Sequence, residues 1–466
     1  MNITEKTKKM MFGMVLGGTL ILGTMSVGVF ALTNDAPRIE SILTRVTECL
    51  QVQNYEGALA LFDELAPSDR ETSGIRLLQA SILNTAGRRN EARALTEKVL
   101  AGDNTNVDAL FMLSTIEAAA GRERDQRTLL ERLLKLDPNH VQALVSLGTI
   151  YLRSRSWRTA APYFDQALAV EPENGDALLG RAQVYQATQD PQNAEMLLTK
   201  AIGLFPQWLT PRIQRAQVYR NARFFLRALA DLDAAKQIAG TDYWVAVDRG
   251  AVLMDLDRKP EALEEYERAV TLDPNNFLAY VYSAGLKEDM KDYAGAEQAY
   301  NAVIRLKPDY YFAFEGLGIL NLRKGRWIEA RDAFLEAYNR APKETSYALL
   351  ATMTWMRAGK PTDPALKQFV EKAMRGLLRD ASAWWMLRLY HDLSGDGELI
   401  TRLEKEKDEP TKAQMFFYLA HYYDIRGITT LADTYFKQVK TLNQQRILEW
   451  RLNEWAFEQR NLTLDQ

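Results

Sequence analysis

Three histidines and one cysteine are the side chains of this sequence that could most readily serve in catalysis or metal binding. They are His140, His391, His421 and Cys49, and they lie far apart in the chain. A single cysteine forms no intramolecular disulfide, and a structural zinc site takes about four Cys or His ligands. Neither His391 nor His421 has a signature that pairs it with a nucleophile or a metal, and no phosphate-binding loop, nucleophile elbow or EF-hand pattern occurs. We therefore expect no enzyme, no catalytic residue, no metal site and no cofactor.

Arginines are the second group with possible chemistry. Arg181, Arg215 and Arg249 recur at intervals of 34 residues. Such a row could bind an anionic ligand. Alternatively, Asp231 and Glu265, which stand 16 residues after Arg215 and Arg249, could pair with them, whereas Arg181 has a leucine at that separation. Because a half-buried arginine needs a partner, we expect the two pairs to be structural.

The overall charge limits the classes of ligand. The chain has 466 residues, of which 47% are hydrophobic and 26% charged, with a net charge of −3. This balance is not that of a disordered tail or of a strongly basic nucleic-acid surface. The arginine-rich stretch 212–227 could still form a local patch for an acidic partner or a lipid headgroup. We expect no nucleic-acid partner.

The elements that must position these side chains follow a period of 34 residues. Prolines stand at positions 138, 172, 206, 274, 308 and 342, and a glycine occupies the missing position 240. In the eight units that begin at residues 73, 107, 141, 175, 209, 243, 277 and 311, position 8 is always small and position 20 is alanine in seven. Position 24 is large in seven of the eight. The periodicity indicates an internal repeat.

Each unit has the pattern of a helical hairpin. In residues 141–174, Leu144, Leu147, Gly148 and Tyr151 form one stripe of a first helix, a break follows near position 15, and a second helix ends before the proline. Small residues let the two backbones approach, and the large residue at position 24 fills the space beside them. One hairpin cannot bury both of its faces, so the units must stack on one another.

Residues 141–174 resemble the tetratricopeptide repeat. The signature positions hold Leu144, Leu147, Gly148, Tyr151, Trp157, Ala160, Phe164, Ala167 and Pro172. The resemblance implies an all-α, right-handed superhelical solenoid of about a dozen antiparallel hairpins, which binds other proteins rather than catalysing a reaction. We expect an abbreviated first hairpin in residues 33–72, eight contiguous repeats in 73–344, degenerate hairpins in 345–446, and a C-terminal capping helix and tail in 447–466.

The N-terminus predicts export. Lys6, Lys8 and Lys9 precede residues 10–32, which contain no charged side chain, so the body should lie outside the cytoplasm, in the periplasm or cell envelope. The small residues at Val29 and Ala31 suit a signal peptide cleaved after Ala31. The run is also about the ~20 residues that span a bilayer, so residues 1–32 could instead be a single transmembrane anchor. Both alternatives stay open.

The resemblance also predicts where a partner binds, because positions 2, 5, 9, 12 and 13 of the first helices line the inner groove in this family. In residues 175–242 these positions are polar: Gln183, Gln186, Gln217, Arg220 and Asn221. From residue 243 they are apolar and aromatic: Trp244, Val247, Met254, Val281, Phe312, Ile319, Leu322, Met353, Met356, Trp385 and Phe417. A bound partner segment in this C-terminal half is the first hypothesis. The alternative is that the superhelix itself or self-association covers these residues.

These observations favour a non-enzymatic scaffold or adaptor in the cell envelope with a protein partner. A structural component of a larger envelope assembly, such as secretion, motility or outer-membrane machinery, binding by its convex face or its ends, is a second hypothesis. A regulator of a membrane enzyme or transporter ranks below both. The sequence does not identify the partner.

Overall fold

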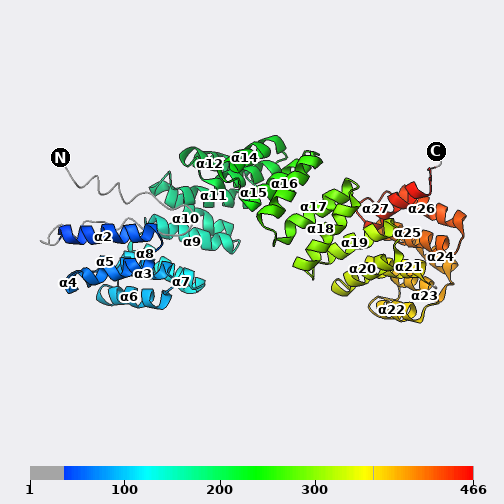
Figure 1. Ribbon diagram of the computed structural model, residues 1–466, viewed down its shortest axis with the longest axis horizontal. Coiled ribbons are helices and arrows are strands. Elements are labelled where there is room, and N and C mark those ends of the chain that lie inside the picture. The colour runs from blue at the N-terminus through cyan, green and yellow to red at the C-terminus, as the bar shows by residue number, and fades with distance from the viewer. Residues whose placement is uncertain (1–35, 360–361, 465–466) are drawn as a thin grey trace. The chain divides into compact units, whose positions relative to one another are not determined.

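The computed structural model describes residues 36–359 and 362–464, and within these ranges it contains 26 α-helices, a short 3-10 helix and no strand (Figure 1). The chain divides into two compact units, unit 1 (Met1–Ala234) and unit 2 (Ala235–Gln466), with the boundary inside the helix Phe225–Ile238. The predicted hydrophobic segment, residues 10–32, lies outside the described residues. None of the described helices is long and apolar enough to cross a membrane.

The first helices of the eight central repeats begin where the 34-residue period places them. They are α5 (Ser73–Thr85), α7 (Val107–Ala119), α9 (Val141–Arg153), α11 (Gly175–Ala187), α13 (Leu209–Asn221), α15 (Tyr243–Asp255), α17 (Phe277–Asp289) and α19 (Tyr311–Arg323). The second helices all begin at position 17. They are α6 (Arg89–Gly102), α8 (Glu123–Leu136), α10 (Trp157–Val170), α12 (Pro191–Leu204), α14 (Phe225–Ile238), α16 (Lys259–Leu272), α18 (Tyr293–Leu306) and α20 (Trp327–Arg340).

The turn inside each hairpin always contains one residue in the left-handed region, at position 15. Three repeats have glycine there, for example Gly87 with φ of +81°. The other five have a larger residue, for example Gln189 with φ of +61°. Glycine adopts this conformation without strain, whereas another residue loses about 1–2 kcal/mol. The hairpin geometry therefore holds even where the sequence lacks its usual turn residue.

The large residue at position 24 packs between two first helices. A Cβ atom added to Gly148 in α9 would lie 2.7 Å from the ring of Phe164, and one added to Gly180 in α11 would lie 2.2 Å from it. Phe164 on α10 thus fits against position 8 of its own repeat and position 6 of the next. Where position 6 is larger, as at Tyr282, the ring stacks on Tyr266 at 5.2 Å instead.

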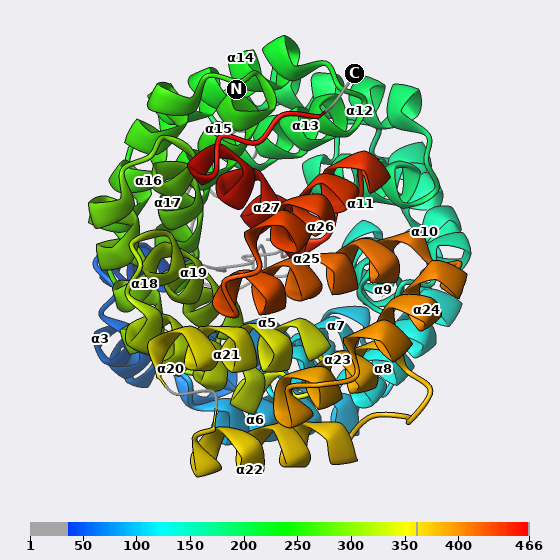
Figure 2. The ribbon, with the colours of Figure 1, turned by 90° about the vertical axis from the view of Figure 1, so that its right-hand side faces the viewer.

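Shorter hairpins flank the central repeats. Unit 1 begins with α2 (Ala36–Gln51), α3 (Tyr55–Leu61), η2 (Phe62–Glu64) and α4 (Pro67–Arg70). Unit 2 ends with α21 (Thr345–Ala358), α22 (Pro364–Arg375), α23 (Ser382–Asp392), α24 (Asp396–Lys405), α25 (Glu409–Ile425), α26 (Thr429–Leu442) and α27 (Leu448–Gln459). Within unit 2, α25, α26 and α27 lie inside the curve formed by α17–α21 (Figure 2).

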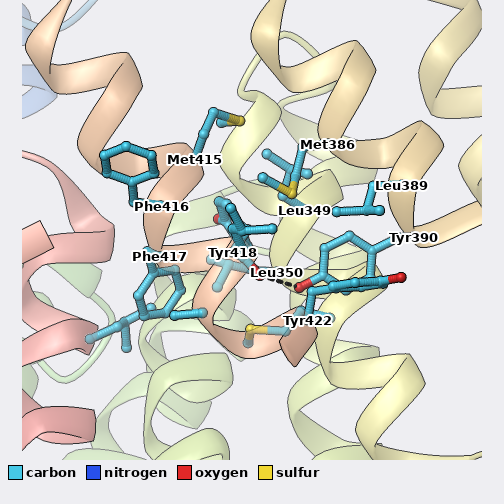
Figure 3. Close-up of a cluster of buried hydrophobic side chains, with 14 of the residues drawn as sticks. Leu349, Leu350, Met386, Leu389, Tyr390, Met415, Phe416, Phe417, Tyr418 and Tyr422 are labelled. Atoms are coloured by element: carbon cyan, nitrogen blue, oxygen red, sulfur yellow. Dashed lines mark hydrogen bonds between the residues drawn. The ribbon is translucent and has the colours of Figure 1, made fainter. Parts of the chain in front are cut away.

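The end of unit 2 has its own large hydrophobic core, which joins α21, α23, α25 and α26 (Figure 3). Met386, Tyr390, Phe417 and Tyr418 are almost completely buried in it. The hydroxyl of Tyr390 donates a hydrogen bond to the backbone oxygen of Tyr418 at 2.7 Å, which satisfies a polar group inside an apolar cluster. This core holds α25 against α21 and α23.

Candidate protein-binding surface

The three periodic arginines all lie in ion pairs, two within one hairpin and one with the preceding hairpin. The guanidinium of Arg215 donates to both carboxylate oxygens of Asp231, at 2.6 and 2.7 Å. Arg249 donates to Glu265 at 2.7 Å. Arg181, for which the sequence offered no acid 16 residues ahead, donates at 2.6 Å to Asp165, 16 residues behind it. An acid 16 residues before or 16 residues after the arginine can pair with it, because the arginine lies between two successive second helices.

The five polar residues predicted to line the groove lie in unit 1. Gln183 and Gln186 on α11 are partly buried, and Gln186 contacts the backbone oxygen of Gln214 at 3.4 Å. Gln217, Arg220 and Asn221 on α13 are exposed.

Two of the aromatic residues predicted for the groove of unit 2 are strongly exposed. Trp244 at the start of α15 is 52% exposed and Phe312 at the start of α19 is 47% exposed. Phe312 contacts the rings of Tyr310 and Tyr311, at centroid distances of 5.6 and 4.2 Å. Val281 on α17 is partly buried and lies in the same pocket as Phe312. These side chains give unit 2 an accessible aromatic surface.

The remaining predicted groove residues of unit 2 are largely covered. Met254 and Trp385 are partly buried. The fully buried ones are Val247, Ile319, Leu322, Met353, Met356 and Phe417. All of these except Val247 belong to the core at the end of unit 2, where α25 and its neighbours pack against α21. A partner can contact the exposed residues Trp244 and Phe312 directly. It could reach these six buried residues only by displacing helices of the chain itself.

A pocket of about 300 Å³ opens beside Phe312, and its lining combines aromatic rings with carboxylates. Tyr310 and Phe312 form its apolar side. Glu288 on α17 and Glu315 on α19 supply the acids, and Arg451 reaches in from α27. The repeat pattern does not predict this pocket, because its two acids and its arginine come from three different helices and Arg451 lies 163 residues after Glu288.

The charges in the pocket are linked by hydrogen bonds. Glu288, whose side chain is 4% exposed, accepts from Arg323 and Arg451 at 3.3 Å each and from the hydroxyl of Tyr300 at 3.1 Å. Glu315 accepts from the hydroxyl of Tyr347. Unit 2 therefore holds a largely buried acidic site next to the exposed ring of Phe312.

Burial is the largest influence on the pKa values of Glu315 and Tyr347. Desolvation raises the pKa of Glu315, and the nearby charges of Glu288 and Glu449 raise it further, whereas the hydrogen bond from Tyr347 and the charge of Arg451 lower it. Desolvation also raises the pKa of the Tyr347 phenol, followed by its hydrogen bond to Glu315. The phenol thus remains a donor to the carboxylate at neutral pH.

The two histidines of unit 2 lie away from this pocket. His421 on α25 is buried and packs edge-on against the rings of Phe417 and Phe436. His391 lies in the last turn of α23 and contacts Asp392 and Glu371. Within residues 36–359 and 362–464, no three His, Cys, Asp or Glu residues are grouped so that they could hold a metal ion.

Comparison with known proteins gives the same repeat. Residues 145–207 and 284–345 match one tetratricopeptide repeat family, and residues 247–276 match a second. A TPR repeat-containing protein of Methanocaldococcus jannaschii is 27% identical over 138 residues, which cover 28% of this chain and 24% of that protein. The chain thus spans about a quarter of the length of this curated relative.

Solved structures with a similar fold are distant in sequence. A tetratricopeptide repeat protein from Parabacteroides merdae is 19% identical, with a TM-score of 0.41, over 53% of this chain and 98% of that one. YrrB, described as a TPR protein with an unusual peptide-binding site, is 19% identical, with a TM-score of 0.34, over 40% of this chain and 95% of that one. The Cut9–Hcn1 structure of the APC/C is 18% identical, with a TM-score of 0.42, over 69% and 64%. Residues 145–207, 247–276 and 284–345 of this chain are tetratricopeptide repeats, set in a continuous series of helical hairpins.

Proposed function

We propose that the chain is a non-enzymatic interaction scaffold that binds a segment of a partner protein on the inner face of unit 2. Tetratricopeptide repeats generally mediate protein–protein interactions. The observation that carries the proposal is the exposure of Trp244 and Phe312. Phe312 also borders a pocket, and large aromatic residues dominate the energetics of interfaces.

A displayed peptide library tests this proposal with three forms of the full chain. Peptides selected on the wild type should no longer bind the Phe312→Asp variant, because the charge would lie in the apolar contact. The matched control is Leu378→Asp, since Leu378 is an exposed apolar residue of unit 2, 75% exposed, between α22 and α23. Equal binding of the selected peptides to all three forms would refute a binding site at Phe312.

Assembly through the second helices is the other candidate function. Leu226 on α14 and Ile328 on α20 occupy the same repeat position, 18, and are 71% and 53% exposed. Apolar residues at this position would suit a structural component of a larger assembly that binds by the outer face. In that case Leu226→Asp and Ile328→Asp, but not Phe312→Asp, should dissociate the chain from its assembly, measured by co-purification of the full chain.

We further propose that the chain is exported and works in the cell envelope. The proposal rests on the lysines before the uncharged residues 10–32. A reporter active only outside the cytoplasm, such as alkaline phosphatase, should be active when fused after residue 40 and inactive when residues 1–32 are deleted. Equal activity of the two fusions would exclude export by this segment. The mass of the mature chain would then distinguish cleavage after Ala31 from a retained anchor.

A further inference from the structure

The pocket beside Phe312 already holds a cation of the chain's own. Arg451 lies on α27, and its guanidinium contacts the carboxylate of Glu288 on α17 at 3.3 Å, across 163 residues of sequence. The same positive charge favours the ionised form of Glu315. The structure thus shows that a guanidinium fits between α17, α19 and α27, with Tyr310 and Phe312 beside it.

Two carboxylates, those of Glu288 and Glu315, line the pocket. The charge of Glu288, and that of Glu449 outside the pocket lining, both raise the pKa of Glu315. The negative charge around Glu315 therefore favours a positively charged group in the pocket.

Arg451 holds its place only loosely. Its side chain is 51% exposed and its contact with Glu288 is long. An ion pair with an exposed partner contributes little to stability. The helix that carries it is firmly fixed, in contrast: Leu452 and Ala456 are buried, and Arg460 pairs with Asp433 at 2.7 Å. The side chain of Arg451 can therefore turn into solvent while α27 stays in place.

We infer that the pocket recognises an arginine or lysine side chain of the partner segment, next to an apolar residue that contacts Phe312, and that Arg451 occupies the site until this side chain replaces it. This inference rests on the proposed function and names the chemistry of its ligand. The incoming cation would lie between Glu288 and Glu315, and the ring of Phe312 or Tyr310 would add a cation–π contact. Arginine fits this site better than lysine because its planar guanidinium can bridge two carboxylates.

Titration calorimetry of the full chain with Nα-acetyl-L-arginine amide tests the inference. The neutral isostere Nα-acetyl-L-citrulline amide is the matched probe, because it has the same shape without the charge. Wild type should bind the arginine probe and not the citrulline probe. Arg451→Gln should bind the arginine probe about two- to fivefold more tightly, because the competing side chain is gone. Arg446→Gln, which removes an exposed arginine just before α27, should leave the affinity unchanged.

Loss of a carboxylate should have the opposite effect. Glu315→Gln should weaken binding at least fivefold, and Glu288→Gln should abolish it. A fold defect could imitate these losses but not the gain in Arg451→Gln. Equal affinity of wild type and Arg451→Gln, or equal binding of the two probes, would overturn the inference. If selected peptides depend on Phe312 but are not enriched in arginine or lysine, the proposed function stands and this inference fails.

Discussion

Gly180 lies against the ring of Phe164 in the preceding repeat, so closely that a Cβ atom on Gly180 would be 2.2 Å from the ring. Phe164 is fully buried and cannot move aside without disturbing its own hairpin. We expect Gly180→Ala to lower the free energy of unfolding by about 1–3 kcal/mol, as overpacking of a core does. Urea unfolding followed by circular dichroism measures the change.

The control for this substitution is Gly203 in α12. A Cβ atom there would meet no other atom within 4 Å. Gly203→Ala should therefore be neutral or should stabilise the chain by up to about 1 kcal/mol, because alanine favours the helix. Similar destabilisation by the two substitutions would show that contact with Phe164 is not the cause.

The ion pair of Arg215 and Asp231 gives a second prediction. Their side chains are 16% and 8% exposed, so removal of one partner leaves a poorly solvated charge. Asp231→Leu should destabilise the chain by about 3 kcal/mol, and the double variant Arg215→Met with Asp231→Leu should recover most of this loss. Urea unfolding of the three forms checks it. If the double variant is as unstable as the single one, the pair does more than satisfy its own charges.

The sequence predicts local structure in this chain well and distant contacts poorly. The starts of the helices follow from the 34-residue period, and the pairing of Arg215 with Asp231 follows from a fixed separation within one hairpin. The period also implies that every hairpin packs against a neighbour. It does not predict that the small residue at position 6, such as Gly180, leaves room for the ring of Phe164 in the preceding repeat. The pairing of Arg181 with Asp165 joins two successive repeats, so it does not follow from the separation found within one hairpin.

The 34-residue period does not predict the candidate site. The signature residues fade after residue 344, and the helices α25–α27 return to the inner side of unit 2. Their packing buries Met353 and Phe417, and it brings Arg451 to Glu288. No periodic pattern encodes these contacts, because they join segments outside the regular repeats.

Burial of His421 predicts a pH dependence of stability. Desolvation, followed by the charges of Arg357 and Arg460, lowers the pKa of His421 well below its ordinary value of 6.5. The unfolded chain takes up a proton there as the pH falls through about 6.5, whereas the folded chain does not. The free energy of unfolding should therefore fall by about 1.4 kcal/mol per pH unit below 6.5 from this group.

The variant His421→Leu distinguishes the contribution of this histidine to the pH dependence of stability from the contributions of other titrating groups. Its urea-unfolding midpoint should depend less on pH between 6.5 and 5 than that of the wild type, whatever its absolute stability. The same slope in the two proteins would mean that His421 is protonated in the folded chain.

Protonation of Glu315 should weaken the binding of a cationic ligand. Because burial raises the pKa of this carboxyl, it loses its charge at a higher pH than an exposed glutamate. The affinity for Nα-acetyl-L-arginine amide should decrease from pH 8 to pH 5. The Glu315→Gln variant should bind this probe more weakly at pH 8, and its affinity should depend less on pH. Calorimetry at three pH values measures it. An equal slope in the variant would assign the titration to another group.

Charged substitutions should distinguish the accessible from the covered part of the predicted groove. Phe312→Asp places a carboxylate at a position where the side chain is 47% exposed. The free energy of unfolding should therefore change by less than about 1 kcal/mol, while peptide binding is lost. Met353→Asp places the same charge in a core where the side chain is 0% exposed, and should destabilise unit 2 by about 4 kcal/mol or more. Limited proteolysis and urea unfolding of the two variants provide the comparison. A stable Met353→Asp variant would mean that α25 separates readily from α21, and the groove would then extend over residues that α25 covers.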